Sequence, residues 1–238
     1  GDAAGDVGDE PLLLARSVPV CIARDRTAGA RFLENHGDGT VIVMDDGLQN
    51  PSLHKDLRIA VVDAGRGLGN GRVIPAGPLR APLDVQLGLV DAVVVNLGPR
   101  KAAPDEGASS VIEAWLRTHF QGPVIRAVVA PGDDTNWLAG ARVVAFAGIA
   151  NPPRFARLIR ACGGEIAATA FFPDHAPYSD RDAEALLALA RRHDAVLVTT
   201  EKDFVRLPAG GEGALARLRQ EARPVPVRME LAAPDAAR

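Results

Sequence analysis

The sequence predicts an α/β protein with parallel β-sheets. Short runs of β-branched and other apolar residues alternate with longer helical stretches, which is the pattern of β–α–β folding. The 238 residues, 47% of them apolar, are enough for a sizeable core. The net charge of −3 gives no general attraction to nucleic acid, and no apolar run approaches the roughly 20 residues of a membrane span. We therefore expect a soluble chain of one large or two small α/β domains that binds no nucleic acid.

In the first half of the chain, apolar runs predict strands and amphipathic stretches predict helices. Residues 41–44 are continuously apolar, which is typical of a strand buried on both faces. The segment 65–82 is dense in Gly and Pro and too long for a plain connection, so it predicts a functional loop. A polar segment at 101–107 is expected on the surface. The expected strands are 18–23, 41–44, 59–62 and 92–95, and the expected helices are 27–35 and 111–120.

Loop-like composition at 131–140, after an extended stretch at 123–130, predicts a domain boundary. In the unit that follows, Pro152 begins a helix, since proline is tolerated in a first turn, and Ser179 caps the next helix. The expected strands there are 143–147, 166–169, 195–199 and 226–231, and the helices run from 152 to about 162 and from 179 to about 192. The expected parts are a first domain at 1–122, a β-ribbon or linker at 123–140 and a second α/β domain at 141–238.

Two adjacent carboxylates follow the apolar run 41–44. Asp45 and Asp46 stand before Gly47, which permits a sharp turn. An apolar strand that ends in acids matches a Walker B arrangement, in which a carboxylate holds Mg²⁺ against ATP phosphates. The alternative is a strand followed by an ordinary Asp-Gly turn. Taken alone, the pattern favours the turn.

Asp9 and His175 are candidates for proton transfer. Asp9 lies in an acidic turn before a Leu-rich helix start, where it is either a base or metal-facing group or a helix-capping residue. The residues alone favour the cap. His175 follows Asp174 in a Pro-bounded loop between a strand and a helix. It is either an orienting group or proton relay, or a surface histidine in a turn, and the pattern favours neither.

Two further loops hold polar groups. Arg72 and Arg80 lie in a glycine-rich loop and can clamp phosphate oxygens, although no Gly-Lys-Ser/Thr follows to make a Walker A motif. The alternative is a structural loop. Thr200 and Asp203 are spaced as a capping box at the start of a short helix, and Lys202 between them can reach a ligand at the same sheet edge. Capping is the favoured role here.

Taken in order, these motifs resemble those of the tetraacyldisaccharide 4′-kinases of lipid A synthesis. The resemblance runs from about residue 6 to residue 231. Its motifs are Val-Gly-Asp-Glu-Pro (7–11), Arg-Asp-Arg (24–26), Asp-Asp-Gly-Leu-Gln (45–49), Gly-Asn-Gly-Arg (69–72), Pro-Ala-Gly-Pro-Leu-Arg (75–80), Phe-Ala-Gly-Ile-Ala-Asn-Pro (146–152), Phe-Pro-Asp-His (172–175) and Thr-Thr-Glu-Lys-Asp (199–203).

The resemblance implies a P-loop NTPase-like fold of two α/β/α units joined by a β-ribbon. It implies transfer of the ATP γ-phosphate, with Mg²⁺, to the 4′-hydroxyl of a tetraacylated glucosamine disaccharide 1-phosphate. It also implies a peripheral enzyme at the cytoplasmic face of the bacterial inner membrane. The implied site residues are Asp9 as base toward the hydroxyl, His175 as its partner, Arg26 and Arg80 at the active site, Asp45 and Asp46 as Walker B acids that bind metal and nucleotide, and Gln49 on the nucleotide side.

By this resemblance Asp9 and His175 come from different domains, so that closing a cleft would assemble the site. Three positions depart from the family pattern, which usually has His, Glu and His where this chain has Asn50, Ala81 and Ala176. Family members also carry Gly-Gly-Thr-Gly-Lys-Thr upstream of the segment that matches Asp9, together with a membrane-anchoring helix. The sequence starts at Gly1, so we expect the first strand and the phosphate loop to be missing from this chain.

The missing loop would supply several preorganised contacts to phosphate, each worth roughly 10²–10³ in rate. We expect this polypeptide by itself to be inactive or nearly so. Two other functions stay open on the sequence: a non-catalytic degenerate kinase module that binds sugar-lipid or nucleotide, and another P-loop-like phosphotransferase.

Overall fold

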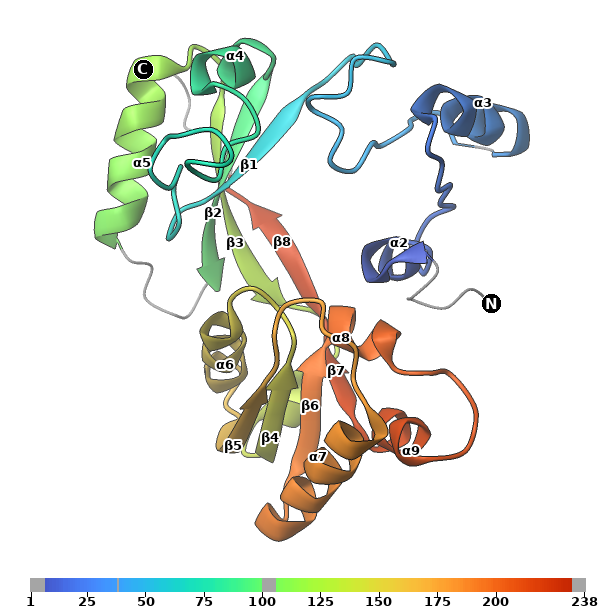
Figure 1. Cartoon of the computed structure of the whole chain (residues 1–238). Helices are drawn as coiled ribbons and strands as arrows, with labels where there is room; N and C mark the ends of the chain where they lie inside the picture. The colour runs from blue at the N-terminus through green and yellow to red at the C-terminus, as the bar shows by residue number, and fades with distance from the viewer. Residues whose placement is uncertain (1–6, 38, 100–105, 233–238) are drawn as a thin grey trace. The chain divides into compact units, whose positions relative to one another are not determined.

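The computed structural model describes residues 7–37, 39–99 and 106–232. The chain forms two compact units (Figure 1). Unit 1 contains residues 1–22 and 131–228, and unit 2 contains residues 23–130 and 229–238. The first 22 residues thus join the second α/β domain, whereas we expected them within a part that ends at 122. Residues 100–105, which hold most of the expected polar segment, lie outside the described ranges.

Unit 2 is built on a four-stranded sheet in which three strands pair in parallel. Its elements are α3 (Arg26–His36), β1 (Ile59–Asp63), α4 (Leu83–Gly88), β2 (Ala92–Pro99), α5 (Glu106–His119), β3 (Val124–Pro131) and the end of β8 (Val227–Leu231), which begins in unit 1. β1, β2 and β3 pair in parallel, and the strand order is β1-β2-β3-β8. Val93 and Val95 of β2 are fully buried and share a core with Ile112 and Leu116 of α5. β3 is therefore an integral strand of this sheet and pairs with β2 as well as with β8.

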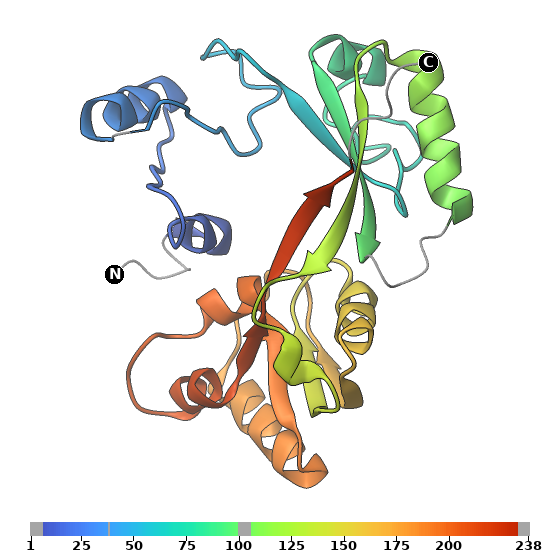
Figure 2. The same ribbon diagram turned by 180° about the vertical axis from the view of Figure 1, so that it is seen from behind.

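Unit 1 is a three-layer α/β/α fold. Its elements are α2 (Asp9–Leu14), the 3-10 helix η1 (Asn136–Leu138), β4 (Arg142–Ala147), α6 (Pro152–Ala161), β5 (Glu165–Phe171), α7 (Asp180–His193), β6 (Val196–Thr200), α8 (Glu201–Arg206), α9 (Ala214–Glu221) and β7 (Arg223–Val225). The sheet is parallel throughout, with the order β5-β4-β6-β7. Figure 2 shows the same sheet from behind.

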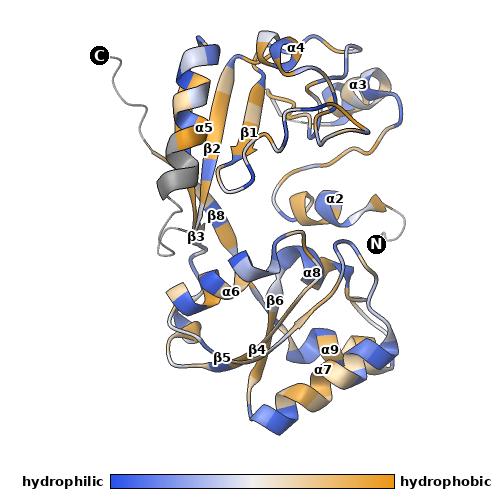
Figure 3. Cartoon of the chain, turned by 60° about the vertical axis from the view of Figure 1, so that its left-hand side comes forward, coloured by the Kyte–Doolittle hydropathy of each residue, from blue (hydrophilic) through white to orange (hydrophobic). Residues whose placement is uncertain are grey.

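The central strand β4 explains the two layers of helices. Val144 and Phe146 pack with α7 and α9 on one face, whereas Val143 and Ala145 pack with α6 on the other. All four residues are fully buried, so the run is apolar without alternation. Figure 3 shows hydrophilic and hydrophobic residues mixed along α7, as expected for a helix with one buried face.

Local signals place the helix starts of unit 1 where the sequence predicts them. Ser179 Oγ accepts a hydrogen bond from the Asp182 amide, and Asp182 Oδ2 accepts one from the Ser179 amide, which completes a capping box for α7. Pro152 stands in the first turn of α6. The Thr200 hydroxyl accepts from the amide of Asp203 at the start of α8. None of the described helices is long and apolar enough to cross a bilayer.

Two expected strands are wrong. Residues 18–23 and 41–44 have no regular secondary structure, and no strand among the described residues pairs with either. Val41 and Val43 are 78% and 88% exposed, so the second run is not buried either. A strand is stable only when a neighbour completes its hydrogen-bond ladder, and apolar composition alone does not provide one. The elements that the sequence did not predict are α4, η1, α9 and β7.

Candidate active site

Asp9 and His175 are brought together by the packing of α2 on α8 within unit 1. Asp9 is the first residue of α2 and is buried, and Gly8 occupies the cap position, so Asp9 is not the helix cap. His175 lies in the loop between β5 and α7 with a positive φ of 58°. Its Nδ1 is 3.2 Å from Asp9 Oδ2. The expectation that the two residues come from different domains is therefore wrong, because Asp9 and His175 both belong to unit 1.

Asp9 Oδ2 is the most unusual atom of this cluster. It is buried and has no well-aligned hydrogen-bond donor among the described residues, although His175 Nδ1 lies within ion-pair distance. Asp9 Oδ1 accepts from the amide of Glu10 at 3.2 Å. Buried carboxylate oxygens are nearly always satisfied, and an exception often marks a functional group. The free oxygen suits a base that receives a proton from a bound molecule.

Lys202 and Glu10 close the cluster on the other side of the imidazole. Lys202 Nζ donates to Glu10 Oε1 at 2.9 Å and lies 3.2 Å from His175 Nε2. Asp174 Oδ1 is farther from the same nitrogen, at 3.8 Å. The sequence analysis noted Lys202 only as a group that could reach a ligand. Its contact with Glu10 joins residues 192 positions apart, which no local pattern indicates.

A buried carboxylate holds the backbone of the His175 loop. Asp203 has no exposed surface and accepts from the amide of Gly148, the hydroxyl of Tyr178 and the guanidinium of Arg206. Arg206 also donates to the carbonyl oxygens of Gly148 and Ala176, and the His175 amide donates to the carbonyl of Gly148. Burial raises the pKa of the Tyr178 phenol, and the nearby Asp203 carboxylate raises it further. The hydroxyl therefore stays a donor.

The sequence analysis found Asp203 as part of a capping pattern but missed this network. Arg206 and Tyr178 were not among the predicted site residues. A charged residue at the end of a short amphipathic helix usually predicts a solvent-exposed position, so the sequence holds no clear signal for Arg206.

The remaining predicted site residues lie in unit 2. Arg80 Nη1 donates to both carboxylate oxygens of Asp46, at 2.8 and 2.6 Å. Asp45 is exposed, and Gln49 donates to the side chain of Gln86. Arg26 begins α3, where its Nη1 donates to the carbonyl of Ala23 at 3.3 Å. The structure thus pairs Arg80 with Asp46, whereas Arg26 contacts a backbone carbonyl of its own segment.

The acids of unit 2 have the chemistry for Mg²⁺, which binds one or two carboxylates together with waters and phosphate oxygens. Asp45 and Asp46 offer such oxygens, although Asp46 is engaged by Arg80. No group of three or more metal-ligating side chains occurs in the described ranges, so these acids form no complete protein cage. The acid at a true strand end is Asp63 of β1, whose Oδ1 accepts from the amide of Gly65 at 2.9 Å. The sequence analysis did not single out Asp63.

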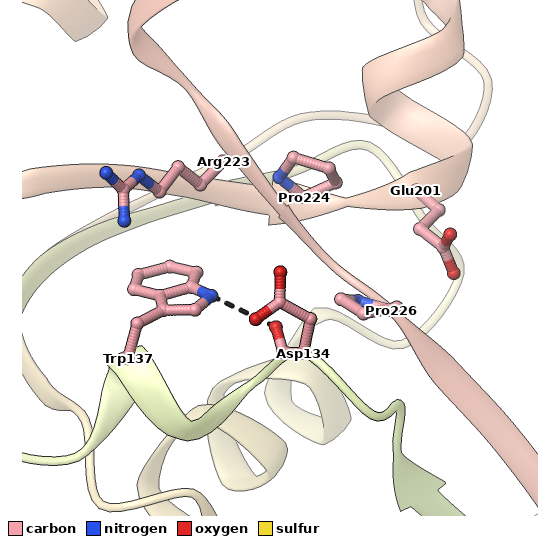
Figure 4. Close-up of a pocket in the computed structure, with 6 residues that line it drawn as sticks. All are labelled: Asp134, Trp137, Glu201, Arg223, Pro224 and Pro226. Carbon is pink, nitrogen blue, oxygen red and sulfur yellow. Dashed lines mark hydrogen bonds between the residues drawn. The ribbon is translucent and has the colours of Figure 1, made fainter.

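A separate cavity of about 330 Å³ lies elsewhere in unit 1 (Figure 4). The Arg223 guanidinium lies over the Trp137 ring, 5.1 Å from its centroid. The residues that line the cavity are Asp134, Trp137, Glu201, Arg223, Pro224 and Pro226. The cavity includes none of the residues around His175.

Comparisons with known proteins identify the family. A family model for LpxK, tetraacyldisaccharide-1-P 4′-kinase, matches residues 1–238. A tetraacyldisaccharide 4′-kinase of Methylorubrum extorquens is 53% identical over 218 residues, which are 91% of this chain and 63% of that protein. The one from Methylobacterium nodulans is 49% identical over 236 residues, 98% of this chain and 64% of that protein. This chain thus spans less than two thirds of the length of these relatives.

The fold has a solved counterpart. A crystal structure of LpxK from Aquifex aeolicus, described as an "apo" form in complex with ATP, matches with a TM-score of 0.67 and 23% identity over 97% of this chain and 67% of that chain. At this identity the match shows the shared fold, a mixed α/β architecture with parallel sheets. By the family model and the relatives, the chain belongs to the tetraacyldisaccharide-1-P 4′-kinase family.

Proposed function

We propose that this chain is part of an enzyme that transfers the γ-phosphate of ATP to the 4′-hydroxyl of a tetraacyldisaccharide 1-phosphate in lipid A biosynthesis. The names of the relatives and the ATP complex of the Aquifex protein support the reaction class. The observation that carries the proposal is the buried Asp9 Oδ2, which accepts no well-aligned hydrogen bond among the described residues and lies 3.2 Å from His175 Nδ1. A buried carboxylate oriented by an imidazole suits a base that takes the proton of a hydroxyl nucleophile.

In this proposal Asp9 takes the proton of the 4′-hydroxyl as its oxygen attacks the γ-phosphorus. The new O–P bond forms while the bond from the γ-phosphorus to the β–γ bridging oxygen breaks, and ADP leaves with that electron pair. His175 holds Asp9 in place from 3.2 Å. The network of Asp203, Arg206 and Tyr178 holds the His175 loop, because phosphoryl transfer depends chiefly on positioning and charge.

We assign the nucleotide side of the reaction to residues of unit 2. Asp45 and Asp46 would hold Mg²⁺, which when bound neutralises charge on the phosphates. Arg80 already binds a carboxylate with Nη1, and its guanidinium has the donor fork that also suits phosphate oxygens. Arg26 and Gln49 complete the proposed set. The P-loop-like fold, the peripheral location at the cytoplasmic face of the inner membrane and the inactivity of this polypeptide alone are parts of the same proposal.

The test is a chimera in which the part of the Methylobacterium nodulans relative that this chain does not cover is joined to this chain. ATP labelled in the γ-position and tetraacyldisaccharide 1-phosphate are the substrates, and labelled lipid is the readout. We expect the chimera to form product with Mg²⁺ and the 238-residue chain alone to form little. Asp9→Asn and His175→Ala should each lower kcat, Asp9→Asn by roughly 10²–10⁴-fold.

His54→Asn is the matched control, because the His54 side chain is 83% exposed and lies in the other unit. It should leave kcat unchanged. A chimera that binds ATP but forms no product would contradict the proposal, as would an Asp9→Asn variant as active as the control.

A non-catalytic sugar-lipid or nucleotide-binding module is the second candidate, and the departures at Asn50, Ala81 and Ala176 favour it. All three positions take part in hydrogen bonds here, and the Ala81 carbonyl accepts one from Gln86 Nε2 at 2.7 Å. Asn50 Oδ1 accepts from the amide and hydroxyl of Ser52, and Ala176 contributes its carbonyl to Arg206. Binding of the lipid by the chimera without turnover would select this candidate.

A further inference from the structure

We propose that Lys202, anchored by Glu10, is a positioning residue that sets the protonation site of His175 so that the imidazole carries its proton on Nδ1, facing Asp9. The inference rests on the proposed function, in which Asp9 is the base. Beyond that function, it gives roles to Lys202 and Glu10 and a defined tautomer to the His175 imidazole.

The donors of Lys202 decide which nitrogen of the His175 ring carries the proton. A lysine ammonium has three N–H donors and no acceptor, so a contact with it must use a lone pair of the partner. Lys202 Nζ is 3.2 Å from His175 Nε2. Nε2 is then the acceptor of the neutral imidazole, and the ring proton lies on Nδ1. That nitrogen is 3.2 Å from Asp9 Oδ2.

The groups around the ring favour the same state. Asp174 Oδ1 lies 3.8 Å from Nε2, too far for a hydrogen bond that would hold a proton on Nε2. On the other side, Asp9 Oδ2 is a buried acceptor that needs a donor. A small rotation of the half-exposed ring would align Nδ1–H with it. Both flanking residues thus select one tautomer.

Glu10 fixes the ammonium in this position. Its Oε1 lies 2.9 Å from Lys202 Nζ, and the Lys202 side chain is only 23% exposed. Glu10 follows Asp9 on α2, and Lys202 precedes Asp203 on α8. The ion pair therefore joins α2, which carries the base, to α8, in which the neighbouring residue Asp203 holds the His175 loop. Asp9, His175, Lys202 and Glu10 form a continuous chain.

The test reads the tautomer directly and needs neither ATP nor lipid. The chain is labelled with ¹⁵N-histidine, and long-range ¹H–¹⁵N correlations are recorded at about pH 8, where free imidazole is neutral. The His175 ring signals are identified as those that are absent from the spectrum of His175→Asn. We expect His175 to be protonated on Nδ1 in the wild type. Lys202→Met, which keeps a long unbranched side chain but removes its donors, should move the proton toward Nε2.

Two variants separate this effect from a loss of folding. Lys202→Arg retains donors and should restore the Nδ1–H form. Lys55→Met removes a lysine of unit 2 and should leave the His175 signals unchanged. A wild-type ring protonated on Nε2, or a Lys202→Met variant that keeps the proton on Nδ1 with native circular dichroism, would overturn the proposal.

The same substitution in the chimera separates the two proposals. We expect Lys202→Met to lower kcat while KM for ATP stays the same, because Lys202 acts through His175 and not on the nucleotide. If the tautomer responds as expected and the wild-type chimera lacks kinase activity, the proposed function fails and the role of Lys202 stands. If the chimera is active and the tautomer does not respond, only the role of Lys202 fails.

Discussion

Asp203 is fully buried in unit 1, and its carboxylate is the partner of the Arg206 guanidinium at 2.8 Å. Replacing it by asparagine keeps the shape and removes the charge. The Arg206 side chain is only 7% exposed, so it would be left as a buried cation without a counter-charge. Removing one partner of a buried pair typically costs about 3–5 kcal/mol. We expect Asp203→Asn to lower the free energy of unfolding of unit 1 by that amount.

The measurement is urea unfolding followed by tryptophan fluorescence in a Trp115→Phe background. The chain has two tryptophans, and Trp137 then reports on unit 1 alone. Asp133→Asn is the matched control, because Asp133 pairs with Arg228 on the surface of the same unit, where its side chain is 96% exposed. Exposed pairs contribute little, so this variant should unfold close to the wild-type midpoint.

Hydrogen exchange gives a second reading of the same variant. The amide of His175 donates to the carbonyl of Gly148, whose own amide donates to Asp203. Loss of Asp203 should therefore speed exchange at His175 before the unit unfolds. The reasoning is refuted if Asp203→Asn and Asp133→Asn unfold at the same urea concentration and the exchange of the His175 amide is unchanged.

Two further predictions concern Ser179 and Tyr178, which directly precede α7. Ser179→Ala should cost about 1 kcal/mol of unfolding free energy at pH 7. Hydrogen bonds from Ser179 lower the pKa of the Asp182 carboxyl. The stabilisation that the ionised carboxylate gives is therefore fully present above the pKa of the unfolded chain, near 3.9, and is lost as the pH falls through the lower pKa of the folded protein. Urea titrations at pH 7 and below about 4 should show the gap between variant and wild type closing. Tyr178→Phe removes a donor to buried Asp203 and should cost about 1–3 kcal/mol. Because burial raises the pKa of the phenol, the wild type should lose stability as pH rises above about 10 and the variant should lose less, which thermal melts between about pH 8 and 11 would check.

The α/β architecture of unit 1 was predictable because its signals are local. The apolar run of β4, the proline in the first turn of α6 and the capping box at Ser179 each specify their element from a few neighbouring residues. β7 has three residues, too few for a periodic pattern to appear, and α9 follows a Gly-rich loop without a side-chain cap. These elements depend on packing against neighbours that the local sequence does not identify.

The run at 41–44 shows where composition fails. Its residues are as apolar as those of β1, and yet β1 pairs with β2 while 41–44 pairs with no described strand. β-propensity describes how a residue fits a sheet and does not provide the partner strand. The expected position of Asp45 and Asp46 at a strand end was therefore not found.

The sequence by itself determined the family motifs and most helices and strands of unit 1, α9 and β7 excepted, because these depend on residue type and short-range spacing. Only the tertiary structure decided which side chains meet. Asp9 and Glu10 lie far along the chain from His175 and Lys202, and they meet because α2 packs on α8. Burial in that contact leaves Asp9 Oδ2 without a donor and places an ammonium against His175 Nε2. Such a contact depends on which helix packs against which, and no local pattern of residues specifies that.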